Sequence, residues 1–136
     1  MSKRKDIFTM LLGITVALIL WVTILSREKR AENPVIYYPF HTLASFPKEI
    51  QSGRLEGNFI GNIILFVPLG VLIPVVTDWK KIWRTAVASI GFSLLIEIIQ
   101  LISSRGCFDP DDVILNGLGC FLGYGFYKVA CRLFKK

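Results

Sequence analysis

The chain has 136 residues, of which 53% are hydrophobic and 19% charged, and its formal net charge is +6. Water-soluble domains distribute their apolar residues periodically, whereas this chain gathers them in long uncharged blocks, so a water-soluble fold is excluded. The basic residues stand at the ends of these blocks, which is the pattern that sets membrane topology. We therefore expect the lipid bilayer as the environment and no nucleic-acid partner.

Four blocks are long enough to cross a membrane. The first, Ile7–Leu25, contains no charge and would form about 28 Å of helix, close to the roughly 30 Å of a bilayer core. The other three are Phe59–Val76, Ile82–Ile102 and Val113–Tyr127, the last of which can extend to Phe134. The sequence predicts an all-α integral membrane bundle of four transmembrane helices, with residues 1–136 forming one domain.

The connection between the first two spans, Ser26–Asn58, is the longest. It carries aromatic residues of the type found at the headgroup level of membranes, namely Tyr37, Tyr38, Phe40 and Phe46. We expect an interfacial segment here. The single histidine, His41, is interpreted as part of that segment and not as a catalyst, because it has no neighbour suited to general base chemistry.

The distribution of basic residues predicts the orientation of the bundle. Ten of the 16 Lys and Arg residues fall on the side of the N-terminus, and six fall on the opposite side over longer loops. Short cytoplasmic segments carry the excess of Lys and Arg in membrane proteins. Both termini are therefore expected in the cytoplasm.

Several polar residues lie at matching depth near the other side. Asn62 is about one turn inside the second span, Glu97 and Gln100 are one to two turns from the end of the third, and Asn116 is about one turn inside the fourth. Alternating spans bring all of them to the same side, beneath the connection that contains Arg105. We expect a polar cluster there.

Helical spacing predicts which way these residues point, because positions three or four apart share a face. Three stripes combine polar and small residues: Ser89, Ser93, Glu97 and Gln100; Asp112, Asn116, Gly119 or Cys120, and Gly123; and Asn62, Phe66 and Gly70. Small residues let membrane helices approach and polar ones need partners, so the stripes should face one another. Gly13 and Ala17 predict a similar packing edge on the first span.

The segment "DPDD" (109–112) is a good helix start. Asp109 is placed to cap the helix, Pro110 to occupy its first position, and Asp111 to face its positive end. Asp112 shares a face with Asn116 and should point into the bundle.

The cluster has several open interpretations. A carboxylate inside a membrane is costly, which singles out Glu97 as a functional candidate. The seven candidate binding residues are Asn62, Glu97, Gln100, Arg105, Asp109, Asp112 and Asn116. Two alternatives stay open, a structural network of polar contacts and a divalent cation among clustered carboxylates (Glu97, Asp109 and Asp112). We predict no metal or cofactor.

At these residues the sequence resembles the VanZ-like family of bacterial membrane proteins. The resemblance spans about residues 37–124 and is carried by "YYPFHTL" (37–43), "GNFIGNIILFVPLGVLIP" (57–74) and "SLLIEIIQLISSRGCFDPDDVILNGLGCFLGY" (93–124). The positions that match the family signature are Asn62, Phe66, Pro68, Gly70, Glu97, Gln100, Arg105, Asp109, Asp112, Asn116 and Gly119. The resemblance implies a small multi-pass protein of the bacterial cell membrane.

The resemblance also implies an association with low-level resistance to teicoplanin, a lipoglycopeptide that binds cell-wall precursors. The first hypothesis is an envelope factor whose outward polar site binds a lipid headgroup, a lipid-linked wall precursor or a wall-synthesis protein and so limits drug access. The alternative is an enzyme acting on a lipid-linked or phosphorylated substrate, with Arg105 holding the phosphate and Glu97 or Asp112 acting as acid or base. A small proton-coupled exporter using Glu97 is the third.

Overall fold

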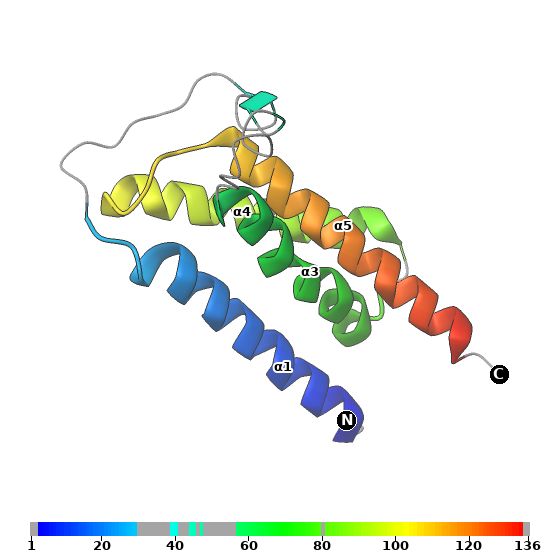
Figure 1. Cartoon of the computed structure of the whole chain (residues 1–136). Coiled ribbons are helices and arrows are strands. Elements are labelled where there is room, and N and C mark those ends of the chain that lie inside the picture. The colour runs from blue at the N-terminus through cyan, green and yellow to red at the C-terminus, as the bar shows by residue number, and fades with distance from the viewer. Residues whose placement is uncertain are drawn as a thin grey trace.

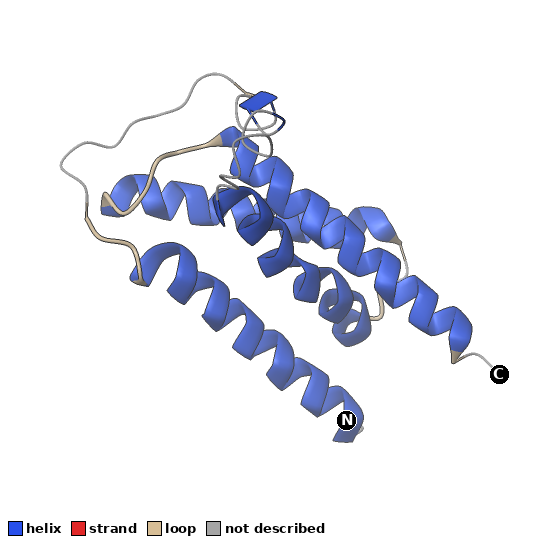
Figure 2. Cartoon of the chain, viewed as in Figure 1, coloured by secondary structure: helices blue, strands red, loops and turns tan. Residues whose placement is uncertain are grey.

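The computed structural model describes residues 3–29, 39–40, 44–45, 47, 57–79 and 81–134. Its helices are α1 (Lys3–Leu20), the π-helical turn η1 (Trp21–Leu25), α3 (Gly57–Thr77), α4 (Ile82–Ser103) and α5 (Pro110–Leu133) (Figure 1). The described part of the chain forms no regular strand (Figure 2). All four long helices, the first including η1, are long and apolar enough to cross a membrane, which confirms the predicted bundle of four spans.

The predicted interfacial segment between the first two spans falls mainly on residues that the structure does not describe. Tyr37, Tyr38, His41 and Phe46 lie outside the described residues. Phe40 is described and is exposed.

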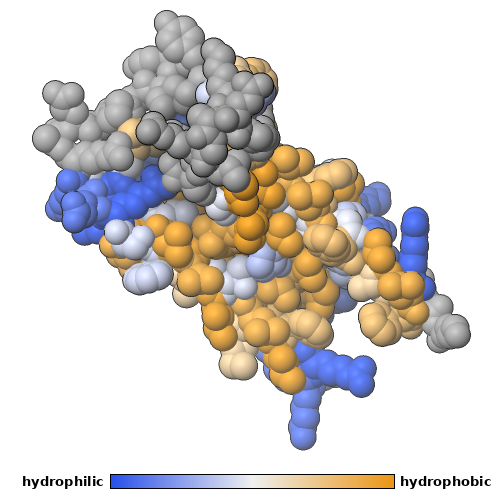
Figure 3. Space-filling model, viewed as in Figure 1, coloured by the Kyte–Doolittle hydropathy of each residue, from blue (hydrophilic) through white to orange (hydrophobic). Residues whose placement is uncertain are grey.

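The helices alternate in direction, so each end of the bundle collects distant parts of the chain. The N-terminus of α1 and the C-terminus of α5 lie toward one end, which we call the terminal end (residues 3–6, 77–79, 81–84 and 128–134) (Figure 1). The other end combines the end of η1, the start of α3 and the connection from α4 to α5. We call it the polar end (residues 21–29, 59–62 and 96–116). Figure 3 shows apolar surface over the middle of the bundle and hydrophilic groups toward its ends.

Helices α3 and α5 pack through glycines. A Cβ atom added to Gly119 would overlap the carbonyl oxygen of Ile63, and one added to Gly123 would overlap that of Val67. Gly70 faces the carbonyl oxygen of Cys120 in the same way. The predicted stripes on these two helices therefore do face each other, and the glycines allow their backbones to touch.

Helix α1 packs differently, through large apolar side chains. Its Ile19 belongs to the buried core together with Ile24, Phe66, Leu69 and Ile96, and Leu12, Val16 and Leu20 pack against that core. Gly13 has no atom within 4 Å of its added Cβ, and Ala17 is exposed. The predicted small-residue edge on the first span is wrong, because the larger residues on another face make the contact.

Candidate functional site

One face of α4 is polar and almost completely buried. It consists of Thr85, Ser89, Ser93, Glu97 and Gln100, whose exposed fractions do not exceed 2%. The predicted stripe is confirmed, and Thr85 extends it toward the terminal end. Buried polar groups in a membrane bundle require hydrogen-bond partners, so the partners of this face decide what it does.

Glu97 fixes the connection that leads from α4 to α5. Its Oε2 accepts a hydrogen bond from the backbone N–H of Asp109 at 2.9 Å. The Asp109 carboxylate in turn accepts one from the N–H of Asp111 at 2.9 Å and is the N-cap of α5, with Pro110 following it. The predicted helix start is therefore confirmed, and the carboxylate of Glu97 determines where that start lies.

Two further bonds join the three helices of the cluster. The Asn62 amide nitrogen on α3 donates to Asp112 Oδ1 on α5 at 2.6 Å. The Asn116 amide nitrogen on α5 donates to the Ser93 hydroxyl on α4 at 2.8 Å. The structure thus brings Asn62, Asp112 and Asn116 into contacts between helices at the polar end, as their depth predicts.

Gln100 and Arg105 bind the end of the first span. The Gln100 amide nitrogen donates to the carbonyl oxygen of Thr23 at 2.8 Å, and Arg105 Nη1 donates to those of Leu25 and Arg27 at 3.2 Å each. A cation suits these carbonyls, because the C-terminal end of a helix carries partial negative charge. Arg105 therefore uses its Nη1 group on carbonyl oxygens at the end of η1 and just after it, a contact that the sequence did not indicate.

Arg27 is a member of the cluster that the sequence analysis missed. A Cβ added to buried Gly106 would lie 3.3 Å from Arg27 Nη1 and 3.2 Å from Gln100 Cβ, so the guanidinium lies beside Gln100. Arg27 could have been placed at the polar end by its depth, because the first span ends only two residues before it.

Asp111 also does more than the sequence indicated. Its fully buried carboxylate accepts a hydrogen bond from the backbone N–H of Phe40, 71 positions earlier in the chain. Phe40 has a left-handed backbone with φ of 69°, which costs a non-glycine residue energy. Asp111 therefore holds part of the connection between α1 and α3 over the start of α5.

Two amide oxygens near Glu97 remain open to further hydrogen bonds. Gln100 Oε1 and Asn116 Oδ1 are buried and accept no hydrogen bond from the described residues. The hydroxyls of Thr85 and Ser89, deeper along α4, are in the same state. Such groups are rare in folded proteins and indicate places where a donor from water or a ligand would be stabilised.

The carboxylates are not arranged as a metal site. Within the described residues, no group of three or more His, Cys, Asp or Glu side chains is placed to hold a metal ion. The arrangement of Glu97, Asp109 and Asp112 thus gives no support to the divalent-cation alternative.

These features define the class of protein, which is a multi-pass integral membrane protein with four spans and a polar cluster buried at one end. The sequence model of the VanZ/LLP1 family matches residues 8–133. The chain therefore belongs to the VanZ/LLP1 family, as its resemblance predicts.

A curated relative agrees with this membership over part of the chain. "Protein VanZ" from Enterococcus faecium is 39% identical over an alignment of 79 residues, and the match covers 54% of this chain and 48% of that protein. The matched region thus spans about half the length of this relative. No solved structure matches the chain.

Proposed function

We propose that this protein is an envelope factor of the bacterial cell membrane that lowers the access of a lipoglycopeptide such as teicoplanin to cell-wall precursors. Its polar end would face outward and bind a lipid headgroup, a lipid-linked wall precursor or a wall-synthesis protein. The observation that carries the proposal is the meeting of Glu97, Asp112 and their neighbouring amides, from three helices, at one end of a membrane bundle.

The chemistry of the cluster supports a ligand that donates hydrogen bonds. Gln100 Oε1 and Asn116 Oδ1 are acceptors without a donor among the described residues, and the carboxyl groups of Glu97 and Asp112 add further oxygen acceptors at the same end of the bundle. Ammonium, hydroxyl and amide groups of lipid heads or wall precursors have the matching donors. Burial strengthens such bonds, because water competes for them less than at an open surface.

The distribution of charge supports an outward polar end. The terminal end and its flanking segments hold the majority of the Lys and Arg residues, which favours the cytoplasm for that end. A site at the opposite end would then meet the outer leaflet, where a lipoglycopeptide and its wall precursor meet.

The test is a susceptibility measurement in a sensitive Gram-positive host that expresses the full chain. Glu97→Gln is the sharpest variant, because glutamine keeps one oxygen for the Asp109 N–H and replaces the other carboxyl oxygen with an uncharged NH2 group. Asp112→Asn does the same opposite Asn62. Glu28→Gln is the matched control, because Glu28 is an exposed carboxylate at the same end.

We expect the wild type to protect against teicoplanin and not against vancomycin. Glu97→Gln and Asp112→Asn should lose this protection at unchanged membrane levels, whereas Glu28→Gln should keep it. Normal membrane levels without protection by any variant would refute the resistance role. Protection that survives both substitutions would refute the role of the cluster.

The enzymatic alternative is examined in the same cells by mass spectrometry of their lipids. The bonds of Arg105 to the end of the first span do not favour it as a phosphate ligand. A lipid species that accumulates with Glu97→Gln and disappears with the wild type would reverse this preference.

A further inference from the structure

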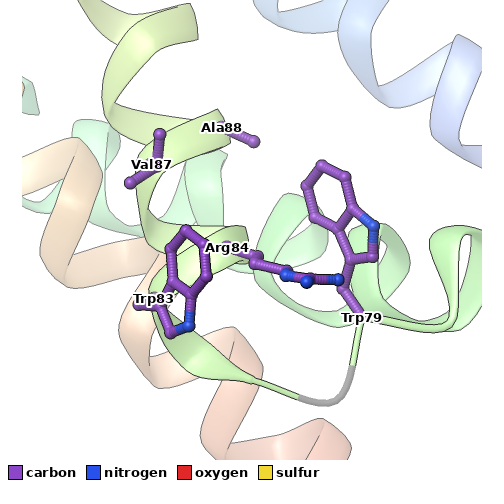
Figure 4. Close-up of a pocket in the computed structure, with 5 residues that line it drawn as sticks. All are labelled: Trp79, Trp83, Arg84, Val87 and Ala88. Carbon is purple, nitrogen blue, oxygen red and sulfur yellow. The ribbon is translucent and has the colours of Figure 1, made fainter.

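A cavity of about 300 Å³ opens at the terminal end of the bundle. Figure 4 shows this cavity in close-up. It is lined by Trp79, from the turn after α3, and by Trp83, Arg84, Val87 and Ala88, from the first two turns of α4. Figure 4 shows the two indole rings on either side of the Arg84 side chain, with Val87 and Ala88 further along the helix. The cavity therefore combines a cation, two amphipathic rings and an apolar wall.

The cavity lies where the polar and apolar layers of a bilayer meet. Helix α4 begins at Ile82 and crosses the membrane, so its first two turns run from the headgroup level into the acyl chains. Trp residues concentrate at this level. Trp83 is 56% and Val87 63% exposed, so the cavity is reached from the lipid and not from inside the bundle.

The cation of the cavity is available to an anion. The Arg84 guanidinium lies 5.4 Å from the centre of the Trp83 ring, and no carboxylate of the described residues forms an ion pair with it. The nearby carboxylate of Asp78 binds Lys5 instead. A guanidinium presents two parallel N–H groups that match a phosphate, and exposed Lys81 adds positive charge beside it.

From this geometry we propose that the cavity binds one anionic glycerophospholipid. Arg84 takes the phosphate, and the start of an acyl chain lies between the tryptophan rings along Val87 and Ala88. A free anion would leave the apolar wall uncovered, and an apolar helix would leave Arg84 without a counter-charge. A lipid with a negative head and a hydrocarbon chain satisfies both parts, independently of what binds at the polar end.

Tryptophan fluorescence measures this binding directly, because two of the three tryptophans line the cavity. The third tryptophan, Trp21, lies at the other end of the bundle, so the Trp21→Phe substitution removes its fluorescence from the measurement. The full chain is reconstituted into phosphatidylcholine vesicles that contain a small fraction of brominated-chain phosphatidylglycerol or brominated-chain phosphatidylcholine. Bromine quenches only rings that its lipid contacts.

We expect phosphatidylglycerol to occupy the cavity about fivefold more readily than phosphatidylcholine, as about 1 kcal/mol for one basic residue at an anionic surface implies. Arg84→Gln should abolish the preference, and Arg84→Lys should keep part of it. Arg132→Gln, which removes an exposed arginine from the last turn of α5 at the same end, should leave it unchanged.

Two results would overturn the proposal. Equal quenching by both brominated lipids in the Trp21→Phe protein would show that the cavity does not select the headgroup. A preference that survives in Arg84→Gln would assign it to the general charge of the terminal end. Unchanged quenching by brominated phosphatidylcholine in Arg84→Gln shows that the variant is folded.

Discussion

The two ends of the bundle treat charged side chains in opposite ways. At the polar end, Glu97 and Asp111 are 2% and 0% exposed, and each accepts a backbone N–H from a connecting segment. At the terminal end, Lys5 and Asp78 form an ion pair whose side chains are 40% and 74% exposed. The polar end therefore contains fully buried carboxylates, whereas the ion pair of the terminal end is exposed to solvent.

The contrast between the two ends follows from what a charge contributes to stability when it is buried and when it is exposed. A buried carboxylate loses its hydration and is stable only with fixed hydrogen-bond donors, so it determines the conformation of the segments that supply them. Exposed charges keep their hydration and contribute little to stability, but they hold the helix ends at the membrane surface. We infer that the buried charges of the polar end fix the conformation of its connecting segments, and that the exposed charges of the terminal end do not.

The largest effect is expected in a thiol-labelling experiment that determines which end of the bundle faces outward. Each end contains a cysteine that can be labelled. Cys107 lies in the connection at the polar end and Cys131 in α5 near the terminal end, and both are partly exposed. In variants that retain one cysteine each, a membrane-impermeant thiol reagent should label Cys107 in intact cells and Cys131 only after permeabilisation. Labelling in the reverse order would place the polar end in the cytoplasm and refute the outward-facing site on which the proposed function depends.

The next effect tests whether Glu97 stabilises the polar end. Glu97→Ala removes the acceptor of the partly buried Asp109 N–H, and a donor that loses its partner away from water costs about 1–3 kcal/mol. Glu97→Gln should cost clearly less, because its amide oxygen accepts the same bond. Unfolding titrations of the purified protein in mixed micelles measure both.

The control for Glu97 is a carboxylate from the other end. Asp78→Ala removes an exposed carboxylate and should destabilise the protein less than Glu97→Ala does. Equal losses from the two alanine variants would contradict the distinction between buried and solvated charge.

A smaller effect on stability is expected from Arg105→Ala. Arg132→Ala at the terminal end is its control. Arg105→Ala removes the donor to the carbonyl oxygens of Leu25 and Arg27. Because these bonds are at least partly exposed, the expected cost is about 0.5–1.5 kcal/mol, the net contribution of an ordinary protein hydrogen bond. Hydrogen exchange should accelerate in peptides covering Trp21–Leu25. Arg132→Ala, at an exposed position, should leave that exchange unchanged, and unaltered exchange in Arg105→Ala would contradict the cap.

The four spans and the meeting of Asn62, Glu97 and Asn116 were predictable from the sequence. Uncharged length defines a span, and depth along alternating spans places residues at one end without any knowledge of packing. The facing of α3 and α5 was predictable too, because Gly119 and Gly123 leave room for another backbone.

The partners of the charges were not predictable in the same way. Arg105 reaches back 78 and 80 residues to the end of the first span, and Asp111 reaches back 71 residues to Phe40. These bonds depend on the path of connections without periodicity, and long side chains can turn toward several neighbours. Arg27 is different, because depth along the first span would have placed it at the polar end. A basic residue beside a span is interpreted first as a sign of topology.

The smallest effect on stability is expected from removing the ion pair between Lys5 and Asp78 at the terminal end. Lys5→Gln removes a bond of 2.7 Å to Asp78, yet exposed pairs contribute only about 0–1 kcal/mol because water and salt screen them. The loss measured in mixed micelles should shrink as salt is raised, since the charge of Lys5 is its main contribution. A salt-independent loss as large as that of Glu97→Ala would mean that the terminal end, too, depends on a desolvated charge. The two ends would then differ in exposure but not in energetics, and the contrast between them would fail at its physical basis.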